Sequence, residues 1–306
     1  MSVRFILENS REDVAKRMSL VNPLNLQEVI RPRTLAEALV HMAREDVAPR
    51  PLAGGTGLLT GTASEVRAVI DLSHLGLDNI YTEDGVLHIG ATASLQDVAE
   101  NPDVRAVGDE VLALAAHLSA PNVQRHQQTV GGVLVAGSSH HDFLVAALAL
   151  DAEVVFFRPE QRDTAQIVPL DTFLVEVRDT PRYLITELRI PLPESAYIRL
   201  ERVARTPRDD AIVNVAVALR VENGTITQAR VVAGGVADRP MRLGAVETLL
   251  AGHTLSKVDM KEVETRAREA VTPMDDWRAS ADYRRHLVGV LTRRALANLQ
   301  TPISNL

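Results

Sequence analysis

The sequence predicts an α+β protein, and three observations carry this prediction. Short β-rich and helical segments alternate over residues 25–192. Beyond Pro191-Leu192-Pro193, where proline interrupts helix and central strand alike, three strand candidates are followed by helical patterns. Hydrophobic residues make up 46% of the 306 residues, which suffices for a sizeable core. We therefore expect two structural units of ordinary size, preceded by a charged extension over residues 1–24.

The first unit is expected to contain short strands and helices in alternation. Thr34 and Glu37 have the spacing of a capping box at a helix start, and Leu35, Leu39 and Met42 follow at helical spacing. Ser94 predicts a second helix start. Further strands are expected over residues 50–53, 66–72, 86–91, 154–157 and 183–190, and further helices over 111–118 and 143–150.

The second unit changes from strands to helices along the chain. Strands are expected over residues 197–203, 212–221 and 225–233, and Asn223-Gly224 predicts a hairpin between the last two. Helical patterns follow over residues 243–250, 260–270 and 283–299. This order predicts a three-stranded antiparallel sheet with a helical bundle.

Composition excludes several classes of function. The net charge is −7 and no stripe of Lys or Arg stands out, which argues against a nucleic-acid partner. The absence of cysteine excludes disulfides, thiolate catalysis and cysteine-ligated iron–sulfur clusters within this chain. The longest clean apolar run, residues 143–150, is too short to span a membrane, and no signal peptide is visible. We therefore expect a cytoplasmic protein.

Two glycine-rich segments are the strongest functional signal. The first runs from Leu52 to Leu59 and the second from Thr129 to Val133, each between apolar segments as expected of a tight loop. Glycine reaches positive φ easily and lets a ligand approach the backbone, and successive N–H groups can form a nest for phosphate. Either segment alone could be an ordinary turn. Together they predict two contacts to one diphosphate-bearing ligand, such as a dinucleotide.

The order of motifs resembles the FAD-binding subunit of the molybdenum hydroxylases, the family of carbon monoxide, xanthine and aldehyde dehydrogenases. The resemblance covers residues 29–296, nearly the whole chain beyond the extension. Four segments carry it: Ile30 to Leu39, Ala53 to Thr56, Gln128 to Gly132 with Asp142 following, and Ser280 to Arg285 with Arg293 to Leu296.

This resemblance implies a fold and a role. The fold is a vanillyl-alcohol-oxidase-type FAD-binding domain over residues 25–192, with two subdomains divided near residues 80–90, followed by a C-terminal domain over residues 193–306. The subunit would hold FAD, receive electrons from the [2Fe–2S] clusters of one partner subunit, and pass them to an external acceptor. A second partner subunit would hold molybdopterin and oxidise the substrate. The implied assembly is a dimer of heterotrimers, and no residue of this chain need act as a general acid or base.

The resemblance also implies the residues that contact FAD. Asp142 would accept hydrogen bonds from ligand hydroxyls, Ile185 would lie near the isoalloxazine ring, and Arg199 or Arg202 would occupy a cationic position. Valine at Gly55 or Gly132 is expected to abolish flavin retention by crowding the backbone. The backbone contacts would come from Ala53, Gly54, Gly55, Thr56, Gly57, Leu58, Thr129, Gly131, Gly132 and Val133.

The sequence departs from the family pattern in one informative place. Val133 stands where the family usually has asparagine, so one cofactor contact is expected to be missing. Two alternatives therefore stay open: a flavin-free structural subunit of the same kind of complex, and a free-standing flavin oxidoreductase.

Two other constellations predict no site. Adjacent His140 and His141 on an extended segment point to opposite sides and have no third ligand at zinc-type spacing, so we expect polar loop residues beside the cofactor pocket. Ser138 and Ser139 lack the Gly-x-Ser-x-Gly pattern of a hydrolase.

Overall fold

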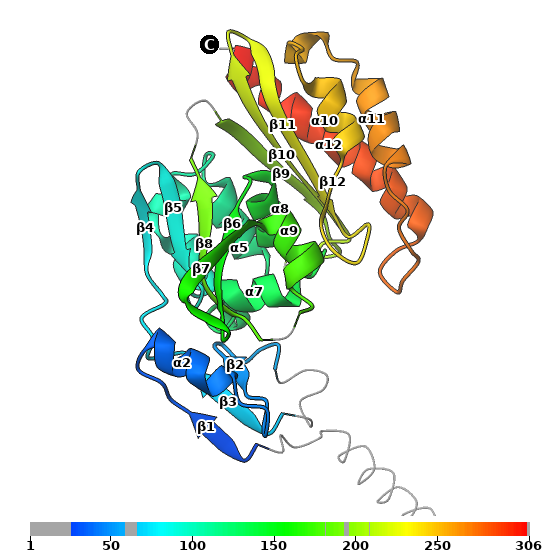
Figure 1. Ribbon diagram of the computed structural model, residues 1–306. Coiled ribbons are helices and arrows are strands. Elements are labelled where there is room, and N and C mark those ends of the chain that lie inside the picture. Colours follow the sequence, from blue (N-terminus) through cyan, green and yellow to red (C-terminus); the bar gives the residue numbers. More distant parts are fainter. Residues whose placement is uncertain (1–25, 59–65, 181, 193–195, 208, 305–306) are drawn as a thin grey trace, which may run out of the picture.

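The computed structural model describes residues 26–304 apart from 59–65, 181, 193–195 and 208, so the expected N-terminal extension lies outside the described residues. Three lobes follow one another in space (Figure 1). We call residues 26–79 the N-terminal lobe, residues 80–192 the middle lobe and residues 196–304 the C-terminal lobe. The middle lobe lies between the other two (Figure 1).

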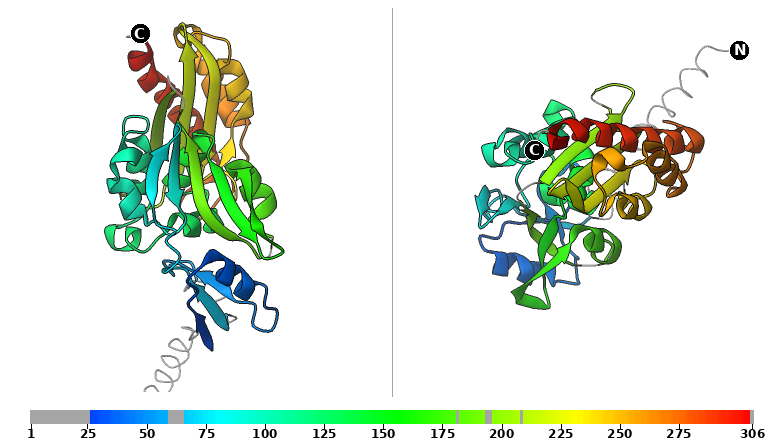
Figure 2. Two further views of the ribbon diagram at one scale, coloured as in Figure 1. Left: turned by 60° about the vertical axis from the view of Figure 1, so that its left-hand side comes forward. Right: turned by 90° about the horizontal axis from the view of Figure 1, so that it is seen from above.

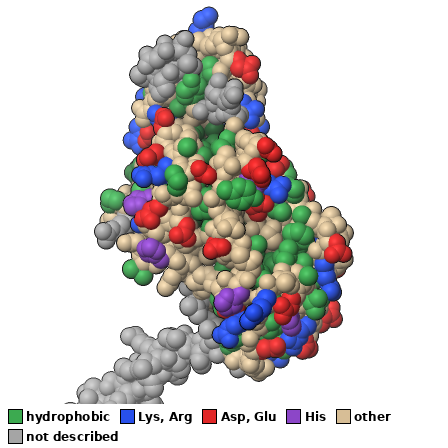
Figure 3. All heavy atoms as spheres, turned by 90° about the vertical axis from the view of Figure 1, so that its left-hand side faces the viewer, with side chains coloured by type: hydrophobic (Ala, Val, Ile, Leu, Met, Phe, Trp, Pro, Cys, Tyr) green, Lys and Arg blue, Asp and Glu red, His purple; other side chains and the backbone are tan. Residues whose placement is uncertain are grey.

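The N-terminal lobe is a small parallel sheet with one helix. Its elements are β1 (Glu28–Ile30), α2 (Leu35–Met42), β2 (Arg50–Leu52) and β3 (Ala68–Asp71), and the strand order is β1-β3-β2. The expected cap of α2 is present, because the Thr34 hydroxyl accepts a hydrogen bond from the Glu37 N–H at 3.2 Å. Charged side chains of both signs crowd the lower end of the molecule, where this lobe lies (Figure 3).

The middle lobe contains a five-stranded antiparallel sheet in the order β4-β5-β8-β6-β7. Helices α5, α7 and α8 share one apolar core with strands β5, β6 and β8, and every residue of α8 is buried. The strands are β4 (Ile80–Glu83), β5 (Val86–Gly90), β6 (Glu153–Arg158), β7 (Gln161–Pro169) and β8 (Leu184–Pro191). The helices are α3 (Leu95–Glu100), α4 (Pro102–Arg105), α5 (Val111–Leu118), α6 (Asn122–Arg125), α7 (Val130–Ala136), α8 (Asp142–Ala149) and α9 (Leu170–Thr172), with a π-helical turn over Phe173–Val177.

The C-terminal lobe has an antiparallel sheet in the order β12-β11-β10-β9. The three expected strands are β9 (Ala196–Val203), β10 (Val213–Glu222) and β11 (Thr225–Gly234), and the two-residue β12 (Met241–Arg242) is a fourth that the pattern did not predict. Asn223 and Gly224 have φ values of 51° and 75°, which is the backbone conformation of the expected hairpin turn. Helices α10 (Gly244–Leu250), α11 (Met260–Glu269) and α12 (Ala281–Ser304) follow, and α12 crosses the sheet (Figure 2).

Both faces of the C-terminal sheet are buried, and this joins two lobes into one body. Along β10, Val215 and Val217 lie in the core formed with the C-terminal helices, whereas Ala216 and Ala218 lie in the core of the middle lobe. This alternation follows from the two-residue period of a strand. The proline-rich boundary near residue 192 therefore separates two patterns of secondary structure but not two independent cores. In the described part of the chain, no helix is long and apolar enough to cross a membrane.

Candidate functional site

The two glycine-rich segments, which are about 75 residues apart in sequence, meet at the joint between the N-terminal and middle lobes. The Cα of Gly54 lies so close to the backbone carbonyl of Gln127 that a Cβ at position 54 would clash with the carbonyl oxygen. The next residue, Gly55, has φ of +72°, which glycine adopts without strain. Absence of a side chain at Gly54 therefore allows the first segment to lie against the start of the second.

The second segment is a helix start rather than a loop, so it does not form a nest of free N–H groups, and contacts of Thr129, Gly131 and Gly132 with a cofactor stay a prediction. Thr129 is the N-cap of α7, and the glycines stand in its first turn. The N–H groups of Val130 and Gly131 donate to Ala93 O at 3.0 Å and to Ala91 O at 2.8 Å. The Gly132 N–H donates to Thr129 Oγ1 at 3.3 Å. Because these donors are already bonded within the protein, they do not form a free cradle for an anion.

The sequence predicts that a side chain is excluded at Gly55 and Gly132, but in these two segments the structure is most crowded at Gly54 and Gly131. A Cβ at Gly131 would lie 3.0 Å from the carbonyl oxygen of Ala91, whereas one at Gly132 would meet only Thr129 Oγ1 at 3.1 Å. At Gly55 the nearest atom would be Leu52 Cδ1 at 3.5 Å, so the obstacle to a side chain there is its positive φ and not a lack of space. Gly54 and Gly131 are the positions where backbone approaches backbone. The remaining residues of the first segment, Ala53, Thr56, Gly57 and Leu58, follow β2 as a turn.

Two predicted contact residues lie within the apolar core. Val133 is 5% exposed and packs in the core of the middle lobe, as does Ile185 on β8, which pairs with Phe156 on β6. The neighbouring Leu184 belongs instead to the core of the N-terminal lobe. The start of β8 thus contributes to both cores at the joint where the glycine segments meet. Whether Val133 and Ile185 contact a cofactor stays a prediction.

Asp142 lies at the second joint, between the middle and C-terminal lobes. It is the first residue of α8 and is completely buried. Asn214 Nδ2, from β10, donates to Asp142 Oδ1 at 2.7 Å, and Arg202 Nε, from β9, lies 3.0 Å from Asp142 Oδ2. Burial raises the pKa of Asp142 to about 6, although Arg202 and Asn214 act in the opposite direction. A role in accepting hydrogen bonds from ligand hydroxyls stays a prediction, and such a ligand would have to share these partners.

The structure shows which of the two arginines, Arg199 or Arg202, lies near Asp142. Arg199 pairs with Asp109 at 3.5 Å in the loop before α5. Arg202 is the arginine that reaches the Asp142 carboxylate, and it also donates to the backbone carbonyl of Asp209 at 2.6 Å. A cationic group therefore stands beside Asp142, and it belongs to Arg202.

Several buried polar atoms in this region lack a hydrogen-bond partner within the described residues. They are Gln128 Oε1, Asn214 Oδ1, both ring nitrogens of His141, and the facing atoms Asp142 Oδ2 and Arg202 Nε, which form an ion pair without a hydrogen bond. Unpaired buried acceptors and donors are costly, and they are commonly satisfied by a bound ligand or by water. The donors and acceptors of these side chains are of the kind that a polar cofactor can satisfy, and their contact with one stays a prediction.

His140 and His141 have different surroundings. His140 Nδ1 lies 2.8 Å from the carbonyl oxygen of Ala211, in the loop between β9 and β10, and burial lowers the pKa of His140. Burial lowers the pKa of His141 to about 4, so this ring is neutral at ordinary pH. Among the described residues, no group of three His, Asp or Glu side chains is arranged to hold a metal ion.

Comparison with known proteins gives matches along nearly the whole described chain. Residues 24–193 match the family model of the FAD binding domain in molybdopterin dehydrogenase, and residues 199–299 match that of the CO dehydrogenase flavoprotein C-terminal domain. The glyceraldehyde dehydrogenase medium chain of Sulfolobus acidocaldarius is 27% identical over 272 residues, which cover 87% of this chain and 95% of that protein. The carbon monoxide dehydrogenase medium chain of Hydrogenophaga pseudoflava is 27% identical over 273 residues, with 87% and 94% covered.

Comparison with solved structures finds the same family of proteins. A carbon monoxide dehydrogenase from Hydrogenophaga pseudoflava, in a form that lacks the Mo-pyranopterin moiety of the molybdenum cofactor, contains a chain that aligns with a TM-score of 0.79. That chain is 27% identical in sequence, and the alignment covers 89% of this chain and 96% of that one. The arrangement of lobes described above is thus shared with a solved protein over nearly its full length.

Proposed function

Because this chain belongs to the family of FAD-binding medium subunits of the molybdenum hydroxylases, and is thus an oxidoreductase subunit, we propose that it transfers electrons through bound FAD. The electrons would come from the [2Fe–2S] clusters of a partner subunit and leave to an external acceptor. A further partner subunit would hold molybdopterin and oxidise the substrate. The zero cysteine count supports this division, since this chain has no thiolates for such clusters.

The observation that carries the proposal is the close approach of Gly54, in the first glycine segment, to the Gln127 carbonyl just before the second, at the joint of the N-terminal and middle lobes. Residues 53–58 would supply the backbone contacts to the pyrophosphate, since the N–H groups of the second segment are already bonded. Asp142 and Arg202 would contact a further part of the same ligand from the other joint. The isoalloxazine ring supplies the redox chemistry when FAD is bound. The chain's own residues would position the ring.

The organisation of the chain follows the same proposal. We assign residues 25–192 to the FAD-binding domain, with its two vanillyl-alcohol-oxidase-type subdomains divided near residues 80–90, and residues 193–306 to the C-terminal domain. The assembly would be a cytoplasmic dimer of heterotrimers. The names of the relatives as medium chains support a multi-subunit complex.

Val133 does not favour the flavin-free alternative. Its side chain is buried in the core of the middle lobe, and the apolar neighbours of this position suit valine. Val133 therefore lends no support to the subunit without flavin.

Substitution of Gly54 by alanine tests the proposal. The added Cβ would clash with the Gln127 carbonyl and separate the two glycine segments, so we expect the complex of Gly54→Ala with its partner subunits to lose bound FAD. Absorption near the flavin bands and chromatography of released cofactor measure this loss. Gly244→Ala is the matched control, because a Cβ there meets no atom within 4 Å. Full flavin in Gly54→Ala, or no flavin in the unaltered complex after addition of FAD, would contradict the proposal.

A further inference from the structure

The Arg202 guanidinium is held by the loop between β9 and β10 as well as by Asp142. Its Nη2 donates to the Asp209 carbonyl at 2.6 Å and its Nη1 to the Pro207 carbonyl at 3.2 Å, while Nε faces Asp142. The two Nη atoms are therefore held by loop carbonyls, and Nε is left facing Asp142 as an ion pair without a hydrogen bond. A shift of the loop would turn the guanidinium away from Asp142.

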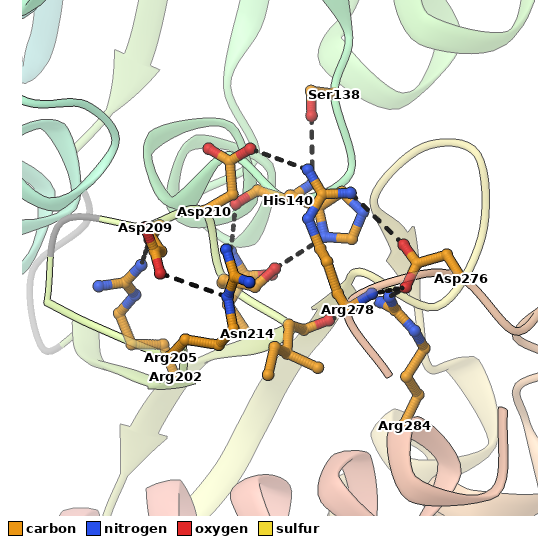
Figure 4. A network of polar contacts seen from close by, with 12 residues as sticks. Ser138, His140, Arg202, Arg205, Asp209, Asp210, Asn214, Asp276, Arg278 and Arg284 are labelled. Atoms are coloured by element: carbon orange, nitrogen blue, oxygen red, sulfur yellow. Dashed lines mark hydrogen bonds and ion pairs between the residues drawn. The ribbon is translucent and has the colours of Figure 1, made fainter. Parts of the chain in front are cut away.

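The same loop is joined by polar contacts to residues 276–284, which lie just before α12 and in its first turn (Figure 4). Arg278 Nη2 lies 3.2 Å from Asp210 Oδ2. The side chain of Arg284, which is 2% exposed, donates to the Ile212 carbonyl at 2.8 Å and is itself paired with Asp276. These contacts come from residues that are far from the Asp142 carboxylate in sequence and do not touch it.

Trp277 adds an aromatic contact between the loop and the residues before α12. Arg205, from the loop, lies over the Trp277 ring at 4.7 Å from its centroid, and Arg278 lies over it at 4.5 Å. Cation–π contacts of this kind favour arginine because its planar guanidinium stacks on the ring. Trp277 is 70% exposed, so the stack is formed at the surface and not within a core that would hold it in place. We use the name clasp for Asp276, Trp277, Arg278 and Arg284.

We propose that the clasp is a positioning device for the FAD site, which fixes the β9–β10 loop and through its carbonyls orients Arg202 toward Asp142. The inference rests on the proposed function, because it takes Arg202 as a flavin-contacting residue. The clasp residues act through Arg202 and not on the cofactor. Arg278 is the most suitable clasp residue to substitute, since its side chain contacts both Asp210 and Trp277 and is 22% exposed.

A double-mutant cycle on FAD affinity tests this coupling in the chain assembled with its partner subunits. Arg278→Ala is expected to weaken FAD binding about fivefold, within the range found for residues that modulate a site without touching its ligand. Arg202→Ala is expected to weaken binding more. In the Arg202→Ala background, Arg278→Ala should have no further effect, because the group through which it acts is gone.

The outcomes distinguish a failure of the clasp inference from a failure of the proposed function. Equal weakening by Arg278→Ala in both backgrounds would show that Arg278 acts independently of Arg202 and would overturn the inference. No effect of Arg278→Ala beside a clear effect of Arg202→Ala would also overturn it, while the proposed function stands. No effect of Arg202→Ala would refute the role given to Arg202 and the inference with it. Arg266→Ala is the control, since Arg266 pairs with Glu262 on the exposed surface of α11, away from the loop between β9 and β10.

Tryptophan fluorescence supplies a readout that needs no cofactor. Trp277 is the single tryptophan of the chain, so its emission reports on the clasp alone. In FAD-free protein, Arg202→Ala should raise the quenching of Trp277 by acrylamide, because the loop that places Arg205 over the ring loses two of its hydrogen bonds. Arg278→Lys, which keeps the charge but stacks less well, should lie between Arg278→Ala and the unaltered protein. Unchanged quenching in Arg202→Ala would mean that loop and clasp are uncoupled.

Discussion

The two joints that hold the middle lobe differ in how they are built. At the C-terminal joint, α8 packs against β10 and β11, and the apolar residues of the sheet continue the core of the middle lobe. At the N-terminal joint, the lobe keeps a small core of its own, to which Leu184 is the buried contribution of the middle lobe within the described residues. Figure 1 shows the same contrast, with the N-terminal lobe set apart below the rest.

This difference indicates which of the two joints a bound cofactor can stabilise. A joint with a continuous core is formed when the chain folds, because its apolar area is buried with that of the lobes themselves. A joint made from a close backbone approach and few apolar contacts opens at a lower free energy. We therefore expect FAD to stabilise the N-terminal joint and the C-terminal joint to determine the stability of the whole chain.

Loss of the Asp142 carboxylate should have the largest effect on stability. Asp142→Ala would leave Arg202, whose side chain is 12% exposed, without its buried partner. Breaking a buried ion pair in this way costs about 3–5 kcal/mol. Urea unfolding followed by far-UV circular dichroism measures the loss. Asp282→Ala is the comparison, since Asp282 pairs with Arg285 and its side chain is 93% exposed. Equal stability of the two variants would show that the C-terminal joint does not depend on this pair.

The pH dependence of stability should reveal two opposing groups at the same joint. Burial raises the pKa of Asp142 to about 6, so the stabilisation from its protonated form is complete below its ordinary value of 3.8 and is lost as the pH rises through 6. Burial lowers the pKa of His141 from 6.5 to about 4, so the stabilisation from its neutral form is complete above 6.5 and is lost as the pH falls toward 4. Between pH 6.5 and 4 the two effects oppose each other.

Substitution of His141 by glutamine should remove one of these two effects. His141→Gln is expected to gain stability relative to the unaltered protein as the pH falls from 6.5 to 4, by up to about 3 kcal/mol. Unfolding in urea at a series of pH values measures the difference between the two curves. Curves that run parallel over this range would mean that His141 does not bind its proton differently in the folded and unfolded chains.

An added methyl group at the C-terminal joint should have an intermediate effect. Gly234 ends β11, and a Cβ there would clash with the Ser139 carbonyl and with the Asn214 amide, and would lie 2.8 Å from Val145 Cγ2. Overpacking of a core costs about 1–3 kcal/mol. Gly234→Ala should therefore lower the free energy of unfolding of the whole chain, whereas Gly54→Ala should lower FAD retention with little change in the unfolding of the middle and C-terminal lobes. Thermal unfolding of both variants without FAD tests this contrast.

Much of the secondary structure follows from local pattern. The helix over residues 111–118 and the strands of the Asn223-Gly224 hairpin lie where their apolar period and turn residues predict them. Strands β4 and β7 are not predicted by the sequence, because all four residues of β4 and all nine of β7 are exposed or only partly buried, which leaves no strong apolar alternation. Helix α7 was missed because Gly131 and Gly132 have low helix propensity, and tertiary contacts to Ala91 and Ala93 override it.

The candidate site was only partly visible in the sequence. Glycine content indicates where backbone can approach backbone, but it does not say which backbone, so the contact of Gly54 with Gln127 required the fold. The approach of Arg202 to Asp142 depends on the pairing of β9 with β10 and on the packing of α8 against that sheet. No local signal specifies that packing. Asn214 could have been noticed as the single amide within a long apolar strand, since such a residue needs a buried partner.

The smallest effect is expected from a polar contact at the N-terminal joint. Arg182, just before β8, donates to the Ala43 carbonyl at 3.4 Å and pairs with Glu45 at 3.3 Å, so it links the middle lobe to the end of α2. The Glu45 side chain is 82% exposed, and an ion pair in such a position contributes about 0–1 kcal/mol. Arg182→Ala should leave the unfolding of the chain nearly unchanged. Hydrogen exchange should nevertheless show faster exchange of the α2 amides than in the unaltered protein, with no change in β10 or β11. Faster exchange in all three elements would mean that the N-terminal joint opens together with the rest of the fold, and the distinction between the two joints would be wrong.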